Sequence, residues 1–272
     1  MMDQAIVEKL EPGMDSPLSA VVLARDRDTL KMVDQAVRTG RVTLAYQPIV
    51  QATAPDRPAF YEGLLRVLDE TVRPIPARDF IEAIEEHETG RIMDCLALEH
   101  GLATLARHPG LRLAINMSAR SIGYRRWVAA LDSALANNPS LANRLILEIT
   151  ETSAMGMPEI VRVFMEDLQA KGITFALDDF GAGYTSFRYL KSFFFDVVKI
   201  DGQFVRGIHS DPDNQVLVQA LVAVARQFEM YMVAESVETA REAAYLTAIG
   251  IDCLQGYHFG APTIAPAWAT RQ

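Results

Sequence analysis

The chain has 272 residues and a net charge of −9, from 26 Lys and Arg against 35 Asp and Glu. This acidic balance argues against a protein that binds long nucleic acids, because such proteins carry a basic surplus that neutralises phosphates. Half of the residues are hydrophobic and 22% are charged, which is typical of a globular domain with a sizeable core.

The N-terminal segment carries neither a signal-peptide pattern nor an apolar run near the roughly 18 residues that a membrane span requires. We therefore expect a cytoplasmic protein with no membrane insertion. The two cysteines, Cys95 and Cys253, show no CxxC spacing, so neither a disulfide framework nor a thiolate zinc site is indicated. Residues 1–27 are poorly periodic and are expected to form a poorly ordered leader before a single domain of residues 28–272.

The first periodic segment predicts a helix that begins with Asp28 as N-cap and stops at Gly40. Eight β-rich runs follow, at residues 42–50, 60–68, 111–118, 145–151, 173–179, 197–201, 231–237 and 253–259. Amphipathic stretches with a helical period separate most of these runs, at residues 77–88, 92–108, 159–172 and 214–228. This alternation predicts a mainly parallel sheet.

Eight strands in about 230 residues fit a closed (β/α)8 barrel, with a doubly wound open sheet as the alternative. Only nine residues join the first two strands, whereas parallel neighbours need a dozen or more. We therefore predict that the first pair is an antiparallel hairpin.

Polar residues recur near the C-terminal ends of the predicted strands, which a barrel gathers at one mouth. They are Glu62, Asn116, Glu148, Glu151, Asp178, Asp179, Lys199, Asp201, Glu235, Glu238 and Gln255. A single carboxylate near a strand end is equally well explained as a solvated edge residue. Several carboxylates close together repel one another, which raises their pKa values unless a cation compensates the charge. Carboxylate and amide oxygens suit Mg²⁺, Mn²⁺ or Ca²⁺, whereas the absence of paired histidines disfavours zinc.

Three local features refine this hypothesis. The adjacent Asp178 and Asp179 could bridge two metal ions, an arrangement known for in-line phosphoryl displacement. Lys199 lies in an apolar strand, either in an ion pair with Asp201 or Asp179 or as a cation that holds a water or phosphate oxygen. The glycine-rich residues 181–183 are either a phosphate cradle or a simple turn.

With these residues in place, the chain resembles the EAL domain family, bacterial phosphodiesterases that open cyclic di-GMP. The resemblance runs from about residue 28 to about residue 265 and depends on eight ordered motifs. They are YQPIV (46–50), EGLLR (62–66), INMS (115–118), LEITET (147–152), DDFGAGYTS (178–186), VKID (198–201), AESVET (234–239) and LQGYHFGAP (254–262). The family fold is a modified TIM (β/α)8 barrel with an antiparallel first strand.

The resemblance implies a role for each site residue. It implies a two-metal site for Mg²⁺ or Mn²⁺, inhibited by Ca²⁺, with the ligands Glu62, Asn116, Glu148, Asp178, Asp179 and Glu235. It implies that catalysis involves Glu62, Asp179, Lys199 and Glu235, the last two positioning or deprotonating the attacking water. It implies substrate contacts by Gln47, Leu64, Arg66 and Gln255. Supporting positions are Glu151, Asp201 and Glu238.

The departures from the family pattern remove no ligand. Gly63 replaces the alanine of the EAL triplet, Ser236 replaces a glycine, and Thr185 replaces a serine. We therefore expect an active, divalent-metal-dependent phosphodiesterase that converts cyclic di-GMP to linear 5′-pGpG. The alternatives are a silent cyclic di-GMP receptor or scaffold and a barrel phosphodiesterase for another small phosphoester.

The resemblance also implies a homodimer coupled through residues 181–195, and it leaves an upstream sensory partner open. The apolar run of residues 193–195 either contributes to that interface or packs in the barrel.

Overall fold

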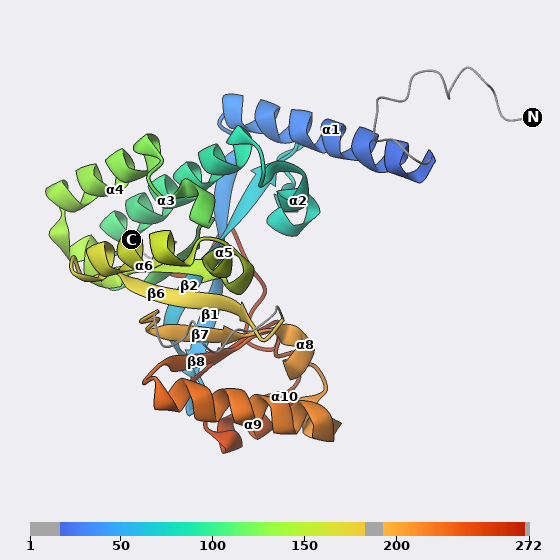
Figure 1. Cartoon of the computed structure of the whole chain (residues 1–272), viewed down its shortest axis with the longest axis vertical. Coiled ribbons are helices and arrows are strands. Elements are labelled where there is room, and N and C mark those ends of the chain that lie inside the picture. Colours follow the sequence, from blue (N-terminus) through green and yellow to red (C-terminus); the bar gives the residue numbers. More distant parts are fainter. Residues whose placement is uncertain (1–16, 183–192, 270–272) are drawn as a thin grey trace, which may run out of the picture.

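The computed structural model describes residues 17–182 and 193–269, and eight of its strands close into a barrel (Figure 1). These strands are β1 (Val42–Gln51), β2 (Ala54–Leu68), β4 (Leu113–Asn116), β5 (Leu145–Thr150), β6 (Thr174–Phe180), β7 (Val197–Ile200), β8 (Tyr231–Ala234) and β9 (Cys253–Gln255). A short additional strand, β3 (Pro74–Pro76), pairs with the end of β2 outside the closed ring. The predicted eight-stranded barrel is confirmed.

Strand β1 is antiparallel to both of its neighbours, β2 and β9, whereas the other barrel pairs are parallel. The predicted hairpin between the first two strands is therefore confirmed. Its connection is shorter than expected, because β2 begins at Ala54 instead of Phe60 and leaves only residues 52–53 between the strands. The modified TIM barrel follows from this single reversed strand.

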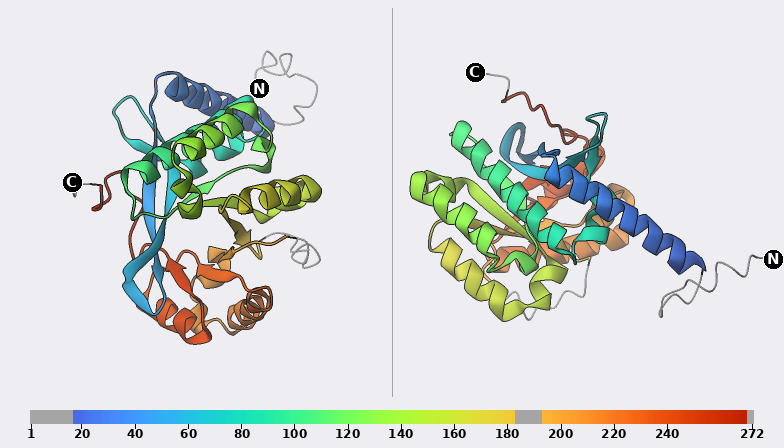
Figure 2. Two further views of the ribbon diagram at one scale, coloured as in Figure 1. Left: turned by 90° about the vertical axis from the view of Figure 1, so that its left-hand side faces the viewer. Right: turned by 90° about the horizontal axis from the view of Figure 1, so that it is seen from above.

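Helices surround the barrel, and α1 projects beyond it at the end where α2 lies (Figure 1, Figure 2). They are α1 (Pro17–Arg38), α2 (Ile81–Ile84), α3 (Glu88–Arg107), α4 (Arg125–Asn137), α5 (Glu151–Gly156), α6 (Pro158–Gln169), α8 (Gly202–Val205), α9 (Pro212–Gln227) and α10 (Ala240–Ile249). Short 3₁₀ turns are η2 (Ala77–Asp79), η3 (Ala119–Ser121), η4 (Pro139–Arg144) and η5 (Ile208–Ser210). None of the described helices is both long and apolar enough to cross a bilayer.

Two helix predictions were wrong in their bounds. The first helix begins at Pro17, so Asp28 lies inside it and does not cap it. Proline is tolerated in a first helical turn, where its missing N–H has no partner to lose. The helix expected over residues 77–88 is divided into η2 and α2, since Phe80 leaves the helical region with φ −142°.

The barrel interior explains how the sequence places its polar residues. Each strand contributes one residue to a single buried apolar cluster, and a polar residue of the site lies two positions away. Because side chains alternate between faces, both members of each pair point into the barrel, and the polar one lies toward the mouth. The pairs are Ile49 and Gln47, Phe60 and Glu62, Ala114 and Asn116, Ile146 and Glu148, Ala176 and Asp178, Val197 and Lys199, Val233 and Glu235, and Cys253 and Gln255.

The outer face of the same strands packs against helices, and Gly63 has a defined place there. A Cβ atom at Gly63 would lie 2.7 Å from Cδ1 of Ile115, on β4. The Ile115 side chain also leaves no room for a Cβ at Gly101, on α3. The isoleucine therefore fills the space that an alanine at position 63 would need.

The C-terminal segment returns across the outside of β1 and β2. Tyr46 and Thr263 exchange two backbone hydrogen bonds, of 2.8 and 3.1 Å. Farther along, the Trp268 ring makes edge contacts with Tyr46, Tyr61 and His108, with ring centroids 4.9–5.6 Å apart. The chain end thus covers the reversed strand and its partner.

Candidate active site and metal centre

The mouth of the barrel contains a cluster of carboxylates around one buried ammonium group, that of Lys199. Lys199 Nζ lies 2.7 Å from Glu235 Oε1, 3.0 Å from Asp178 Oδ1, 3.2 Å from Glu148 Oε2 and 3.5 Å from Glu62 Oε2. Its side chain is only 1% exposed. Lys199 therefore forms ion pairs with these four residues, and the predicted pair with Asp201 or Asp179 was wrong in its partners.

Amide side chains orient the Glu62 carboxylate. Asn116 Nδ2 donates to Glu62 Oε1 at 2.8 Å, and Gln255 Nε2 donates to Glu62 Oε2 at 2.6 Å. Gln255 Nε2 also lies 3.2 Å from Gln47 Oε1, while Gln47 Nε2 donates to the carbonyl of Gly260. The structure therefore brings Gln47, Asn116 and Gln255 to the carboxylate cluster, as the sequence predicted.

The pair Asp178 and Asp179 reaches the site through an irregularity in β6. Successive strand residues normally point to opposite faces. Here the β6–β7 register shifts between Leu177 and Phe180, and Asp179 adopts a left-handed backbone with φ +56°. Aspartate tolerates this conformation better than most residues, and such bulges re-aim side chains. Carboxylate oxygens of Asp178, Asp179 and Glu235 consequently lie within 4.8 Å of one another.

Burial and mutual repulsion shift the ionisation of this cluster. Burial, followed by the charge of Glu62, raises the pKa of Glu148 well above its usual value. Burial raises the pKa of Glu235 to about 8, despite the attraction of Lys199. Burial and the neighbouring Asp178 and Asp201 raise the pKa of Asp179 to about 6.

Two groups of the cluster are held in their charged forms instead. Although burial opposes it, Lys199 together with the amide donors lowers the pKa of Glu62. Burial likewise works against the charge of Lys199, yet the surrounding carboxylates raise its pKa well above the usual value. One ammonium thus compensates only part of the acidic charge.

The donor set fits divalent cations. Two groups of three carboxylates each offer oxygens within 4.8 Å of one another: Glu62, Glu148 and Asp178, and Asp178, Asp179 and Glu235. Asp178 belongs to both groups, as expected of a bridging ligand. The buried Oε1 of Glu148 has no hydrogen-bond partner in the described part of the chain. Hard oxygen donors with residual negative charge are the ligands that Mg²⁺ and Mn²⁺ prefer.

Residues 30–262 of the chain match the EAL domain family. The chain belongs to the EAL domain family. It is 32% identical to the cyclic di-GMP phosphodiesterase PdeF of Escherichia coli (strain K12) over 89% of its own length and 33% of the relative's. It is 33% identical to the bifunctional diguanylate cyclase/cyclic di-GMP phosphodiesterase MucR of Pseudomonas aeruginosa, over 84% of its length and 34% of the relative's. The chain spans about a third of these curated relatives.

Solved EAL structures share the fold. The MucR phosphodiesterase in complex with c-di-GMP matches with a TM-score of 0.76 and 31% identity, covering 89% of this chain and 99% of that one. The FimX EAL domain from Pseudomonas aeruginosa, bound to c-di-GMP, matches with a TM-score of 0.79 and 25% identity, over 88% and 97% of the two chains.

The supporting residues predicted for this EAL domain lie at the edge of the cluster. Glu151 is buried, and its Oε2 accepts a 3.2 Å hydrogen bond from the amide of Gly181 in the segment that follows β6. Asp201 caps α8 by accepting from the amide of Gln203 at 2.7 Å. Glu238 is exposed and lies 3.8 Å from Arg206. Glu151 and Asp201 thus hold the backbone next to the carboxylate cluster.

A cavity of about 330 Å³ opens above the carboxylates of the EAL domain. Its lining includes the predicted residues Gln47, Leu64 and Gln255, while the predicted Arg66 lines an adjoining cavity. The sequence interpretation missed five further lining residues: Arg78, Arg206, Ser236, Gly256 and Tyr257. Gly256 and Tyr257 belong to the quoted motif of residues 254–262. Ser236 carried a further signal, since it replaces the usual family glycine and has the positive φ, +55°, that glycine favours.

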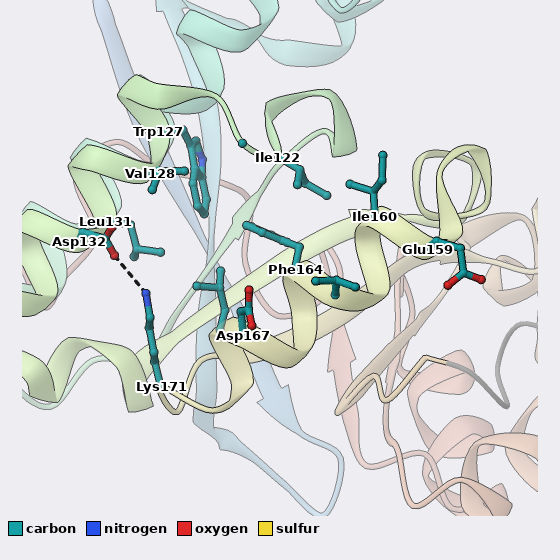
Figure 3. Close-up of a pocket in the computed structure, with 13 residues that line it drawn as sticks. Ile122, Trp127, Val128, Leu131, Asp132, Glu159, Ile160, Phe164, Asp167 and Lys171 are labelled. Carbon is teal, nitrogen blue, oxygen red and sulfur yellow. Dashed lines mark hydrogen bonds and ion pairs between the residues drawn. The ribbon is translucent and has the colours of Figure 1, made fainter.

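A second hollow, of about 540 Å³, lies between α4 and α6 on the outside of the barrel (Figure 3). Apolar side chains such as Trp127, Ile160 and Phe164 line it, and an ion pair between Asp132 and Lys171 lies at one side. It contains none of the predicted site residues. It is therefore separate from the carboxylate cluster of the EAL domain.

The segment predicted to couple two subunits lies partly outside the described residues. Gly183, the last residue of the glycine-rich stretch 181–183, and Thr185 lie outside the described residues. Within the apolar run 193–195, Phe193 and Phe195 are each 4% exposed and pack in the core, whereas Phe194 is 70% exposed. Two of the three phenylalanines therefore have a packing role.

Proposed function

We propose that this EAL domain hydrolyses cyclic di-GMP to linear 5′-pGpG with two Mg²⁺ or Mn²⁺ ions. The observation that carries the proposal is the convergence of four carboxylates on the buried Lys199 at the barrel mouth, with Asn116 bound to Glu62 and Asp179 beside Asp178 and Glu235. The similarity to PdeF and MucR supports cyclic di-GMP as the substrate. Bound divalent metals would neutralise charge on the phosphodiester and lower the pKa of the attacking water.

The chain's own residues prepare the rest of the reaction. The carboxylates around Lys199 raise its pKa, so Lys199 serves as a buried positive charge beside them. Glu235 lies 2.7 Å from Lys199 and faces the cavity, where it can hold the water and accept its proton. In-line attack then expels the ribose 3′-oxygen of one phosphodiester.

Substrate contacts follow from the cavity walls. Leu64 presents an apolar surface to the dinucleotide, and Gln47 and Gln255 present amides beside the reacting phosphate. Arg66 lies next to this wall, where it can bind the nucleotide. Glu62 is held by two amide donors, so its carboxylate does not need to reorganise when metal binds.

The test is chromatographic separation of cyclic di-GMP from pGpG after incubation with Mg²⁺, Mn²⁺, Ca²⁺ or EDTA. We expect pGpG with Mg²⁺ or Mn²⁺ and none with Ca²⁺ or EDTA. The variants Glu62→Gln and Asp178→Asn should lose at least about 100-fold in kcat, because each removes a metal ligand. The exposed Glu82→Gln is the control and should retain wild-type turnover.

Two results would redirect the proposal. Tight binding of cyclic di-GMP without product would make the domain a receptor. Product from another phosphodiester, with cyclic di-GMP untouched, would change the substrate class. We also propose a cytoplasmic location and a homodimer. Light scattering with and without nucleotide tests the homodimer.

A further inference from the structure

Two cavities adjoin at the barrel mouth, and Arg78 forms part of both. One is the cavity above the carboxylates, of about 330 Å³. The other, of about 380 Å³, lies beside it and is lined by Arg66, prolines of the β3 segment and the chain after β9. Arg78 and Tyr257 line both cavities. A ligand that extends from the metal centre into the second cavity must pass these two side chains.

The local chain fixes where Arg78 stands. Strand β3 pairs with β2 so that Pro76 lies opposite Arg66. Pro76 then serves as the N-cap residue of η2, which carries Arg78 in a single tight turn. Because proline restricts the backbone on the approach to this turn, the backbone of Arg78 has a defined position at the boundary of the two cavities.

The Arg78 guanidinium is available for a ligand. Its side chain is 77% exposed, and its ion-pair partner is the neighbouring Asp79, 3.6 Å away and itself 54% exposed. Such an exposed pair contributes little and is easily exchanged. Arg66 is nearby, since the charge of Arg78 contributes to the lowered pKa of Arg66, for which burial is the largest cause. Two cations thus lie side by side next to an acidic centre.

The chemistry of a cyclic dinucleotide matches this arrangement. It contains two phosphodiesters, and the metal centre can hold only the one that is cleaved. The second remains negatively charged and lies one nucleoside farther along the ring. A guanidinium with free N–H donors is the side chain best suited to such a phosphate.

We propose that Arg78 binds the phosphodiester that is not cleaved, an inference that rests on the proposed function. Arg78 then determines affinity for a ligand with two phosphodiesters and leaves the chemical step unaffected. A substrate with one phosphodiester gains nothing from it.

The experiment compares Arg78→Ala with Arg73→Ala on two substrates. Arg73 lies on the same hairpin, is equally exposed at 77% and lines neither cavity, so it is a matched control. With cyclic di-GMP we expect Arg78→Ala to raise KM about 10-fold, which is the effect of losing one charge-assisted hydrogen bond. The kcat should stay within about twofold of the wild-type value. With bis(p-nitrophenyl) phosphate, which has one phosphodiester, neither KM nor kcat should change.

Equilibrium binding of cyclic di-GMP with Ca²⁺ in place of Mg²⁺ should show the same weakening in Arg78→Ala, and Arg78→Lys should recover part of it. Equal behaviour of Arg78→Ala and Arg73→Ala would overturn the inference, as would a parallel loss on the one-phosphodiester substrate. Failure of the wild-type protein to cleave cyclic di-GMP would count against the proposed function alone, because the binding comparison still decides the role of Arg78.

Discussion

At the scale of single residues, the charge of Lys199 offsets the repulsion among the carboxylates and so allows the cluster to be buried in the folded barrel. It lies within 3.5 Å of four carboxylates, and it is almost completely buried. Removing one partner of a buried ionic network leaves charges without compensation. The cluster must then take up protons or bind a cation.

Lys199→Met should therefore lower the free energy of unfolding of the metal-free protein by about 3–5 kcal/mol at pH 8. The loss should be smaller at pH 5, where Glu235, whose pKa is raised to about 8, is protonated and needs no counter-charge. Urea unfolding in EDTA at both pH values measures this. Lys171→Met is the control, since its 3.1 Å pair with Asp132 is exposed and should be worth less than about 1 kcal/mol. Equal losses at both pH values would contradict this account.

At the scale of elements, the contact between β2, β4 and α3 explains a departure from the family motif. Ile115 occupies the space beside Gly63, so Gly63→Ala should crowd the contact and lower the free energy of unfolding by about 1–2 kcal/mol. Gly63→Ala combined with Ile115→Val should recover most of this loss, because the shorter side chain lacks Cδ1. A double-mutant cycle by thermal unfolding measures the coupling. Additive effects would show that Ile115 does not compensate.

Helix α3 also carries a titratable group away from the mouth. Asp94 accepts hydrogen bonds from Ser121 Oγ at 2.6 Å and from the amide of Ser118 at 3.0 Å. Burial nevertheless raises its pKa from 3.8 to about 6. A raised folded-state pKa means that the protonated form is the one that folding favours, so its contribution is complete below pH 3.8 and is lost as the pH rises through 6.

Asp94→Asn imitates the protonated carboxyl at every pH. Its free energy of unfolding relative to wild type should therefore increase between pH 4 and pH 8, by about 1–3 kcal/mol. Chemical unfolding of both proteins across this range provides the measurement, and Asp213→Asn, at an exposed position of α9, provides the control. A difference that is constant with pH would show that Asp94 is charged throughout.

The elements also show what the sequence could and could not predict. Period-two alternation in short strands was sufficient to place Glu62 and Lys199 at one mouth, because each follows an apolar interior residue by two positions. Strict alternation of side chains along β6 would have placed the Asp179 side chain on the outer face of the barrel, opposite Asp178. Its orientation depends on the β6 bulge, which is set by pairing with β7. Arg78 was missed because a short hairpin, and not a barrel strand, brings it to the cavity.

At the scale of the whole molecule, the reversed strand β1 closes the described barrel by pairing with β2 and β9. The end of the described chain packs against the outside of β1 and β2 and stabilises this closure. Trp268 contacts Tyr46 on β1, Tyr61 on β2 and His108 after α3. The two tyrosines are adjacent in sequence to Gln47 and Glu62, and therefore point to the opposite face of the sheet. Trp268 thus stabilises the closure from outside, without a place in the cavity.

Trp268→Ala should accordingly lower the free energy of unfolding by about 2–4 kcal/mol, from lost aromatic contacts and buried area. Turnover of cyclic di-GMP at a temperature where the variant is folded should remain within about twofold of wild type, because the carboxylate cluster lies on the inner face. Tyr231→Ala, at an exposed aromatic position on β8, should change stability by less than about 0.5 kcal/mol. If Trp268→Ala reduced kcat by as much as Glu62→Gln does, closure of the barrel and order of the metal centre would be one cooperative event, and the tail would belong to the catalytic apparatus.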